Sequence, residues 1–120
     1  QIILQNKDQV HLPSGQFGIQ RAEIGLSPTL LGQPLYLRQR KGGEKIHLYG
    51  RMGHWPLKKA IQEAQIFPWT RHTIQILSTD NVMLGVFTPK GFWLAQSAYC
   101  EAGGWLPISF SSTLEFNDEH

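Results

Sequence analysis

The chain has 120 residues and a mass of 13.6 kDa, a length that suits a single domain with one hydrophobic core. Hydrophobic residues make up 41% and charged residues 17%, which excludes a disordered tail, while 12 glycines and 7 prolines exclude a coiled coil. No apolar run approaches the roughly 18 residues of a membrane span. The single cysteine, Cys100, excludes an internal disulfide and a cysteine-rich zinc site.

The net charge of +2 is distributed unevenly along the chain. Residues 35–60 contain seven Lys or Arg side chains and one acidic residue, Glu44, whereas residues 101–120 contain four acidic side chains and no basic one. The positive excess therefore lies in one segment, and such a concentration favours a partner with negative charge.

The first third of the chain contains only weak signals. Residues 2–4 and 10–12 are predicted short strands, and turns are predicted at residues 13–15 and 27–28. The absence of an initiating methionine at Gln1 indicates a piece of a longer or processed protein. We expect residues 1–120 to form one domain, with a frayed acidic end at residues 112–120.

Residues 35–41 and 44–50 flank Gly42 and Gly43, a pattern typical of a β-hairpin with a two-residue turn. The implied register places Arg40 opposite Lys45 and Arg38 opposite His47. It also sorts the apolar residues onto one face and the cations and tyrosines onto the other. Like charges directly opposite each other cost up to about 1 kcal/mol, so an anion bound nearby would stabilise this hairpin.

A helix is predicted after Pro56, because the apolar residues Leu57, Ala60, Ile61 and Ala64 recur at helical spacing. Pro68 is expected to end it. Its first turn carries Lys58 and Lys59, where acidic residues are preferred, and this placement favours a phosphate at the helix N-terminus.

A second hairpin is predicted for residues 73–78 and 82–87 around Asp80 and Asn81. Its strands are apolar on both faces, which is typical of central strands covered on both sides. Further strands are predicted at residues 92–99 and, with a kink at Pro107, at residues 105–110. The expected fold is α+β, a mostly antiparallel sheet of about five to six strands built from hairpins, with one amphipathic helix packed on a face. The expected directions of the central side chains are Ile74, Ile76, Met83 and Phe87 to one face, and Leu77, Val82, Leu84 and Val86 to the other.

The basic segment leads to the first functional hypothesis, a non-catalytic domain that binds an anionic partner, most often nucleic acid, RNA or DNA. No paired acid, base or nucleophile is identifiable, and the five histidines lack metal-ligand spacing, so we predict no catalytic residue, metal or cofactor, and the sequence favours a non-enzymatic domain in the cytoplasm. The candidate anion-binding residues are Tyr36, Arg38, Arg40, Lys45, His47, Tyr49, Arg51, Lys58 and Lys59.

Three alternatives remain open. In the first, the basic face is simply solvated, or paired with the acidic end of the chain. In the second, the domain is a protein-interaction module that uses an exposed edge or the aromatic residues Phe92, Trp93 and Tyr99. In the third, it is a small-molecule enzyme with an arginine-lined pocket. The oligomeric state is not predictable from these features, and no membrane insertion is expected.

Overall fold

The computed structural model describes residues 1–110, so the predicted frayed end at residues 112–120 lies outside the described residues. Strands dominate this part of the chain, with one α-helix and two 3₁₀ helices, η1 (Pro28–Leu30) and η2 (Pro68–Thr73). The other elements, in chain order, are β1 (Ile2–Ile3), β2 (Gln9–Leu12), β3 (Gly15–Leu26), β4 (Pro34–Gln39), β5 (Lys45–Ile46), β6 (Trp55–Pro56), α1 (Leu57–Glu63), β7 (Gln75–Thr79), β8 (Val82–Thr88), β9 (Gly91–Leu94), β10 (Cys100–Ala102) and β11 (Trp105–Phe110).

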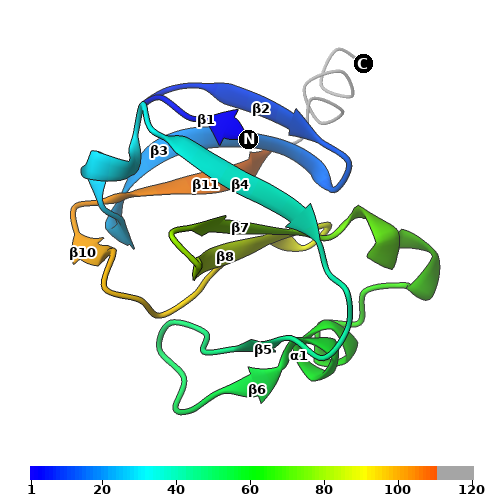
Figure 1. Cartoon of the computed structure of the whole chain (residues 1–120). Coiled ribbons are helices and arrows are strands. Elements are labelled where there is room, and N and C mark those ends of the chain that lie inside the picture. Colours follow the sequence, from blue (N-terminus) through cyan, green and yellow to red (C-terminus); the bar gives the residue numbers. More distant parts are fainter. Residues whose placement is uncertain (111–120) are drawn as a thin grey trace, which may run out of the picture.

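The strands form two sheets and a small ribbon. The larger sheet has the order β1-β4-β7-β8-β9, the smaller one pairs β10, β11 and β2 with the long strand β3, and the ribbon is β5-β6. Every pairing between these strands is antiparallel. Figure 1 shows β2, β3 and β11 above β7 and β8, with the ribbon and α1 below them. The predicted α+β class, with a mostly antiparallel sheet and one helix, is confirmed.

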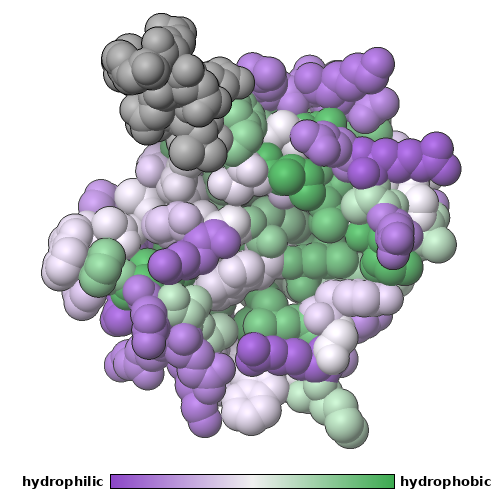
Figure 2. All heavy atoms as spheres, turned by 180° about the vertical axis from the view of Figure 1, so that it is seen from behind, coloured by the Kyte–Doolittle hydropathy of each residue, from purple (hydrophilic) through white to green (hydrophobic). Residues whose placement is uncertain are grey.

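The larger sheet is covered on both faces. One core cluster, which includes Leu35, Leu77 and Trp105, draws its residues from both sheets. The second cluster combines Ile76 and Val86 of the larger sheet with residues of α1 and the ribbon, among them Leu57, Ile61 and Ile46. Hydrophilic side chains border an apolar middle on the face seen in Figure 2, as expected for three stacked layers whose outer surfaces meet water.

The predicted hairpin around Asp80 and Asn81 is present, and both turn residues have the positive φ angles that such a turn requires. The predicted side-chain directions agree with the structure as far as Leu84 and are reversed for Val86 and Phe87. Leu77 pairs with Gly85 and Ser78 with Met83, so Leu84 is an extra residue in β8. This bulge directs Phe87 into the cluster between the sheets and Val86 into the cluster beside α1, the reverse of the predicted directions.

The predicted hairpin around Gly42 and Gly43 is wrong. β4 pairs with β1 and β7, whereas β5 pairs with β6, so residues 35–41 and 44–50 do not face each other. Arg38 lies opposite Ile76 and Lys45 lies opposite Pro56. The physical reason is burial: between β1 and β7, β4 pairs Leu35 with Ile2 and Leu37 with Leu77, so Leu35 is buried and Leu37 half-buried, whereas a bare two-stranded hairpin would expose both.

The helix is present where the apolar spacing predicts it, with Leu57, Ala60 and Ile61 buried. It ends at Glu63, before Gln65 adopts a left-handed φ of 59°, rather than at Pro68, which begins η2. The predicted strand at residues 92–99 ends at Leu94. No helix of the described residues is long and apolar enough to cross a membrane.

Candidate nucleic-acid interface

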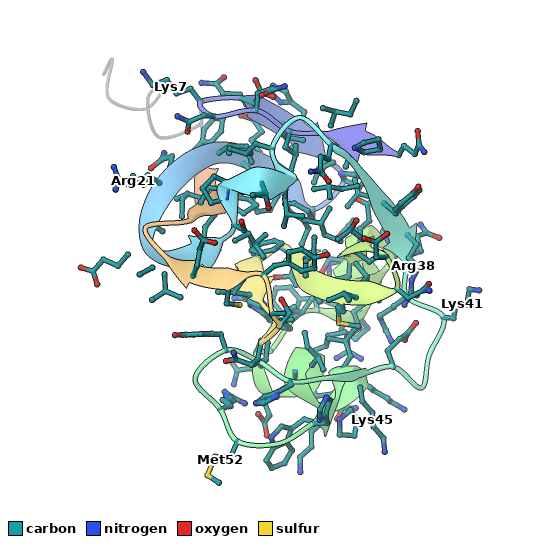
Figure 3. All side chains as sticks on the ribbon, turned by 60° about the vertical axis from the view of Figure 1, so that its left-hand side comes forward. Lys7, Arg21, Arg38, Lys41, Lys45 and Met52 are labelled. Atoms are coloured by element: carbon teal, nitrogen blue, oxygen red, sulfur yellow. The ribbon has the colours of Figure 1, made fainter. Side chains whose placement is uncertain are left out.

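The basic segment, residues 38–59, links the larger sheet to the ribbon and α1. Figure 3 shows Arg38, Lys41 and Lys45 on one side of the molecule, with Lys7 and Arg21 on the other. Three of the seven cations that the sequence groups together therefore lie on one side of the structure, although no hairpin creates this arrangement.

Glu44 organises the bend between β4 and β5. Its carboxylate accepts hydrogen bonds from the backbone N–H groups of Lys41 (2.7 Å) and Gly42 (2.9 Å) and pairs with the guanidinium of Arg38 (3.2 Å). Burial alone raises the pKa of Glu44. Its effect is outweighed by the hydrogen bonds from these two backbone N–H groups, from the N–H of Glu44 itself and from Arg38, which together hold the pKa below its usual range. Arg38 is thus already engaged by the one carboxylate in the basic segment.

Three lysines project from the ribbon and the start of α1. Lys45, Lys58 and Lys59 are exposed, and the Lys59 ammonium lies 5.0 Å from the ring centroid of Trp55. α1 has only seven residues, and the N–H of Leu57 at its start donates to the carbonyl of Glu44 (2.8 Å), so this N–H already has a partner and the predicted phosphate site at the helix N-terminus stays a prediction. The lysines act here as separate exposed charges.

His47, Tyr49 and Arg51 form part of the loop between β5 and β6. Nε2 of His47 is hydrogen-bonded to the carbonyl oxygen of Arg51 (2.8 Å), and Arg51 pairs with Glu63 of α1 at 3.5 Å. Tyr49 and Arg51 border a cavity of about 510 Å³ between this loop, α1 and β9. Tyr36, by contrast, lies on β4, where it and Arg38 border a different hollow. The two tyrosines therefore do not share the single face that the hairpin predicts.

A basic pocket was missed by the sequence reasoning. It has a volume of about 330 Å³, and we call it the Arg40 pocket. Nε of Arg40 is buried and has no hydrogen-bond partner among the described residues. Arg71 and His72 enter from η2, which follows Arg40 by about 30 residues along the chain, so no local sequence pattern indicated the pocket. The lining residues are Gln39, Arg40, Lys41, Gly42, Arg71, His72 and Ile74.

The predicted interface residues Phe92, Trp93 and Tyr99 are half-buried. Phe92 and Tyr99 pack against the cluster between the sheets, and Trp93 packs against the cluster beside α1. Much of each ring is therefore used inside the fold. Groups of three or more His, Cys, Asp or Glu side chains that could hold a metal ion are absent from residues 1–110.

Comparisons with known proteins identify the family. Residues 35–106, more than half of the chain, match the family described as the TilS substrate C-terminal domain. The chain is 89% identical over 66 residues to a tRNA(Ile)-lysidine synthase of Acinetobacter baylyi, covering 55% of this chain and 14% of that protein. It is 41% identical over 73 residues to that of Alkalilimnicola ehrlichii, covering 60% and 16%. The chain thus spans about a seventh of the length of these curated relatives.

A solved structure supports the fold. The crystal structure of a TilS C-terminal domain aligns with a TM-score of 0.59 and 21% identity, covering 90% of this chain and 95% of that one. The interpretation as a non-catalytic binding domain is wrong, because the matching relatives are named as enzymes that act on tRNA. The family match includes the whole basic segment. The chain belongs to the family of TilS substrate C-terminal domains.

Proposed function

We propose that this chain works as the C-terminal domain of a tRNA(Ile)-lysidine synthase and takes part in that enzyme's recognition of its tRNA. The observation that carries the proposal is the family match over residues 35–106, which contains all seven cations of the basic segment. A nucleic-acid partner and a cytoplasmic location both fit such a role.

Electrostatics supports tRNA as the partner. Of the seven cations in the basic segment, Arg38 and Arg51 pair with carboxylates of the described residues, while Lys41, Lys45 and Lys58 are exposed and make no such pair there. Each lysine that neutralises a phosphate releases about one counterion, which makes binding favourable and dependent on salt. The domain would therefore increase the affinity of the enzyme for tRNA.

The test uses the complete enzyme with Lys45→Gln and Lys58→Gln combined. We expect affinity for a tRNA transcript to fall about tenfold at moderate salt, and the slope of log affinity against log salt to decrease by about 2, because two phosphate contacts are lost. In the modification reaction, KM should rise with little change in kcat, since the loss concerns binding.

The matched control is the double variant Lys7→Gln and Lys90→Gln, which removes two exposed lysines outside the basic segment. Its affinity and salt slope should stay close to those of the unmodified enzyme. Equal behaviour of the two double variants would show that the basic segment does not contact tRNA.

A further inference from the structure

The second surface feature is a pair of stacked aromatic rings on the turn into η2. The rings of Phe67 and Trp69 lie parallel within 4°, with centroids 4.7 Å apart, and the side chains are 58% and 70% exposed. Thr70 fixes the turn by donating from its backbone N–H and its hydroxyl to the carbonyl of Phe67 (3.0 and 2.9 Å). Two large aromatic rings are thus held in a fixed position although much of their apolar surface is exposed to water.

The same turn leads into the Arg40 pocket. Arg71 lies two residues after Trp69, a rise of about 4 Å along a 3₁₀ helix, and its Nε donates to the carbonyl of Ile66 (3.2 Å), which holds the guanidinium beside the turn. None of the residues that line the pocket is acidic. The acidic residue of the adjoining loop, Glu44, already accepts from two backbone N–H groups and Arg38.

We propose that the Phe67–Trp69 pair and the Arg40 pocket together bind one unpaired RNA nucleotide, with its base stacked on the rings and its phosphate held by Arg40 and Arg71. The inference rests on the proposed function, that the domain contacts RNA, and it locates a contact that the basic segment alone does not provide.

The chemistry of the aromatic pair and of the Arg40 pocket favours an unpaired nucleotide as the ligand. A base inside a duplex has both faces covered by its neighbours, so only an unpaired nucleotide presents a face to an aromatic pair. The buried Nε of Arg40 needs an acceptor, and a phosphate oxygen supplies one together with the negative charge that the neighbouring cations require. An apolar protein segment would cover the rings but leave this nitrogen and these cations without a partner.

The experiment compares three RNA probes on the complete enzyme: a blunt hairpin, the hairpin with a four-nucleotide 3′ overhang, and the hairpin with an abasic overhang of the same charge. We expect the overhang with bases to bind about tenfold more tightly than the abasic one, as stacking of one base on an aromatic ring implies. Trp69→Leu should abolish this difference and leave affinity for the blunt hairpin unchanged, whereas Trp69→Phe should retain most of it.

Arg40→Gln tests the phosphate half. It should weaken both overhang probes equally, reduce their salt slope by about 0.7, the value for one phosphate of a single strand, and weaken the overhang probes more than the blunt hairpin. The control is Met52→Ala, which truncates an apolar side chain that is 91% exposed on another loop and should change nothing.

The outcomes separate the two proposals. If both overhangs bind equally in the unmodified enzyme, or if Trp69→Leu keeps the difference, the nucleotide site is refuted while binding of the blunt hairpin still supports the proposed function. Failure of all three probes to bind would refute both. A loss of activity in Trp69→Leu with unchanged RNA affinity would assign the rings to a protein contact and overturn the site.

Discussion

Glu44 determines the path of the basic segment at the scale of a single residue. Replacing it by Gln removes the charge but keeps the size of the side chain, so the bonds to Lys41, Gly42 and Arg38 weaken together. We expect the free energy of unfolding to fall by about 1 kcal/mol at pH 7. Urea denaturation of the unmodified and Glu44→Gln proteins measures this difference.

The same pair of proteins has a defined pH dependence. Because folding lowers the pKa of Glu44, its contribution is complete above the unfolded value of about 4.3 and is lost as the pH falls through the folded pKa. The stability difference between the two proteins should therefore shrink below about pH 4. Glu63→Gln, in an exposed pair with Arg51, is the control and should cost under about 0.5 kcal/mol at pH 7. A difference that is constant from pH 7 to pH 3 would contradict the role given to the Glu44 charge.

At the scale of elements, local signals located β7, β8 and α1, and long-range pairing decided the rest. Asp80 and Asn81 specify a tight turn by themselves, and the α1 spacing is periodic. Gly42 and Gly43 also adopt positive φ angles, but the pairing of β4 with β7 places Leu37 opposite Leu77, in a strand that follows much later in the chain. No pattern within a short stretch of sequence indicates which strand pairs with β4.

The same limit applies to the candidate site. The sequence identifies the basic segment because charged residues can be counted without knowing the fold. It does not predict that Arg71 lies close to Arg40. The long strand β3 was missed because the apolar alternation of Phe17 and Ile19 is broken by Arg21 and Glu23, the next residues on the same face. A pocket assembled from two segments that are distant in the sequence is not visible in any single window of sequence.

Gly85 in β8 allows β9 to approach closely beside the bulge. A Cβ at this position would overlap the ring of Phe92 and lie 2.6 Å from the carbonyl oxygen of Trp93. Gly85→Ala should therefore lower the free energy of unfolding by about 1–3 kcal/mol. Gly18→Ala in β3 is the control, because its nearest contact would be an ordinary 3.7 Å to the side chain of Gln20. Equal thermal midpoints for the two variants would contradict the close approach of β8 and β9.

At the scale of the whole molecule, both core clusters depend on the sheet that separates them. Ile76 faces α1 and the adjacent Leu77 faces the smaller sheet, and both are fully buried. Loss of packing on one face therefore loosens the strands that support the other, so α1 and the smaller sheet should unfold together rather than as separate units.

Ile61→Ala tests this coupling, because Ile61 of α1 is fully buried in the cluster that excludes the smaller sheet. The truncation should cost about 2–5 kcal/mol. Hydrogen exchange of the complete protein should show that protection falls by the same free energy in α1 and in the most protected amides of β3 and β11, while Met52→Ala leaves all three unchanged. If protection falls in α1 alone, the larger sheet does not transmit the loss, and the ribbon with α1 is a unit that opens independently of the two sheets.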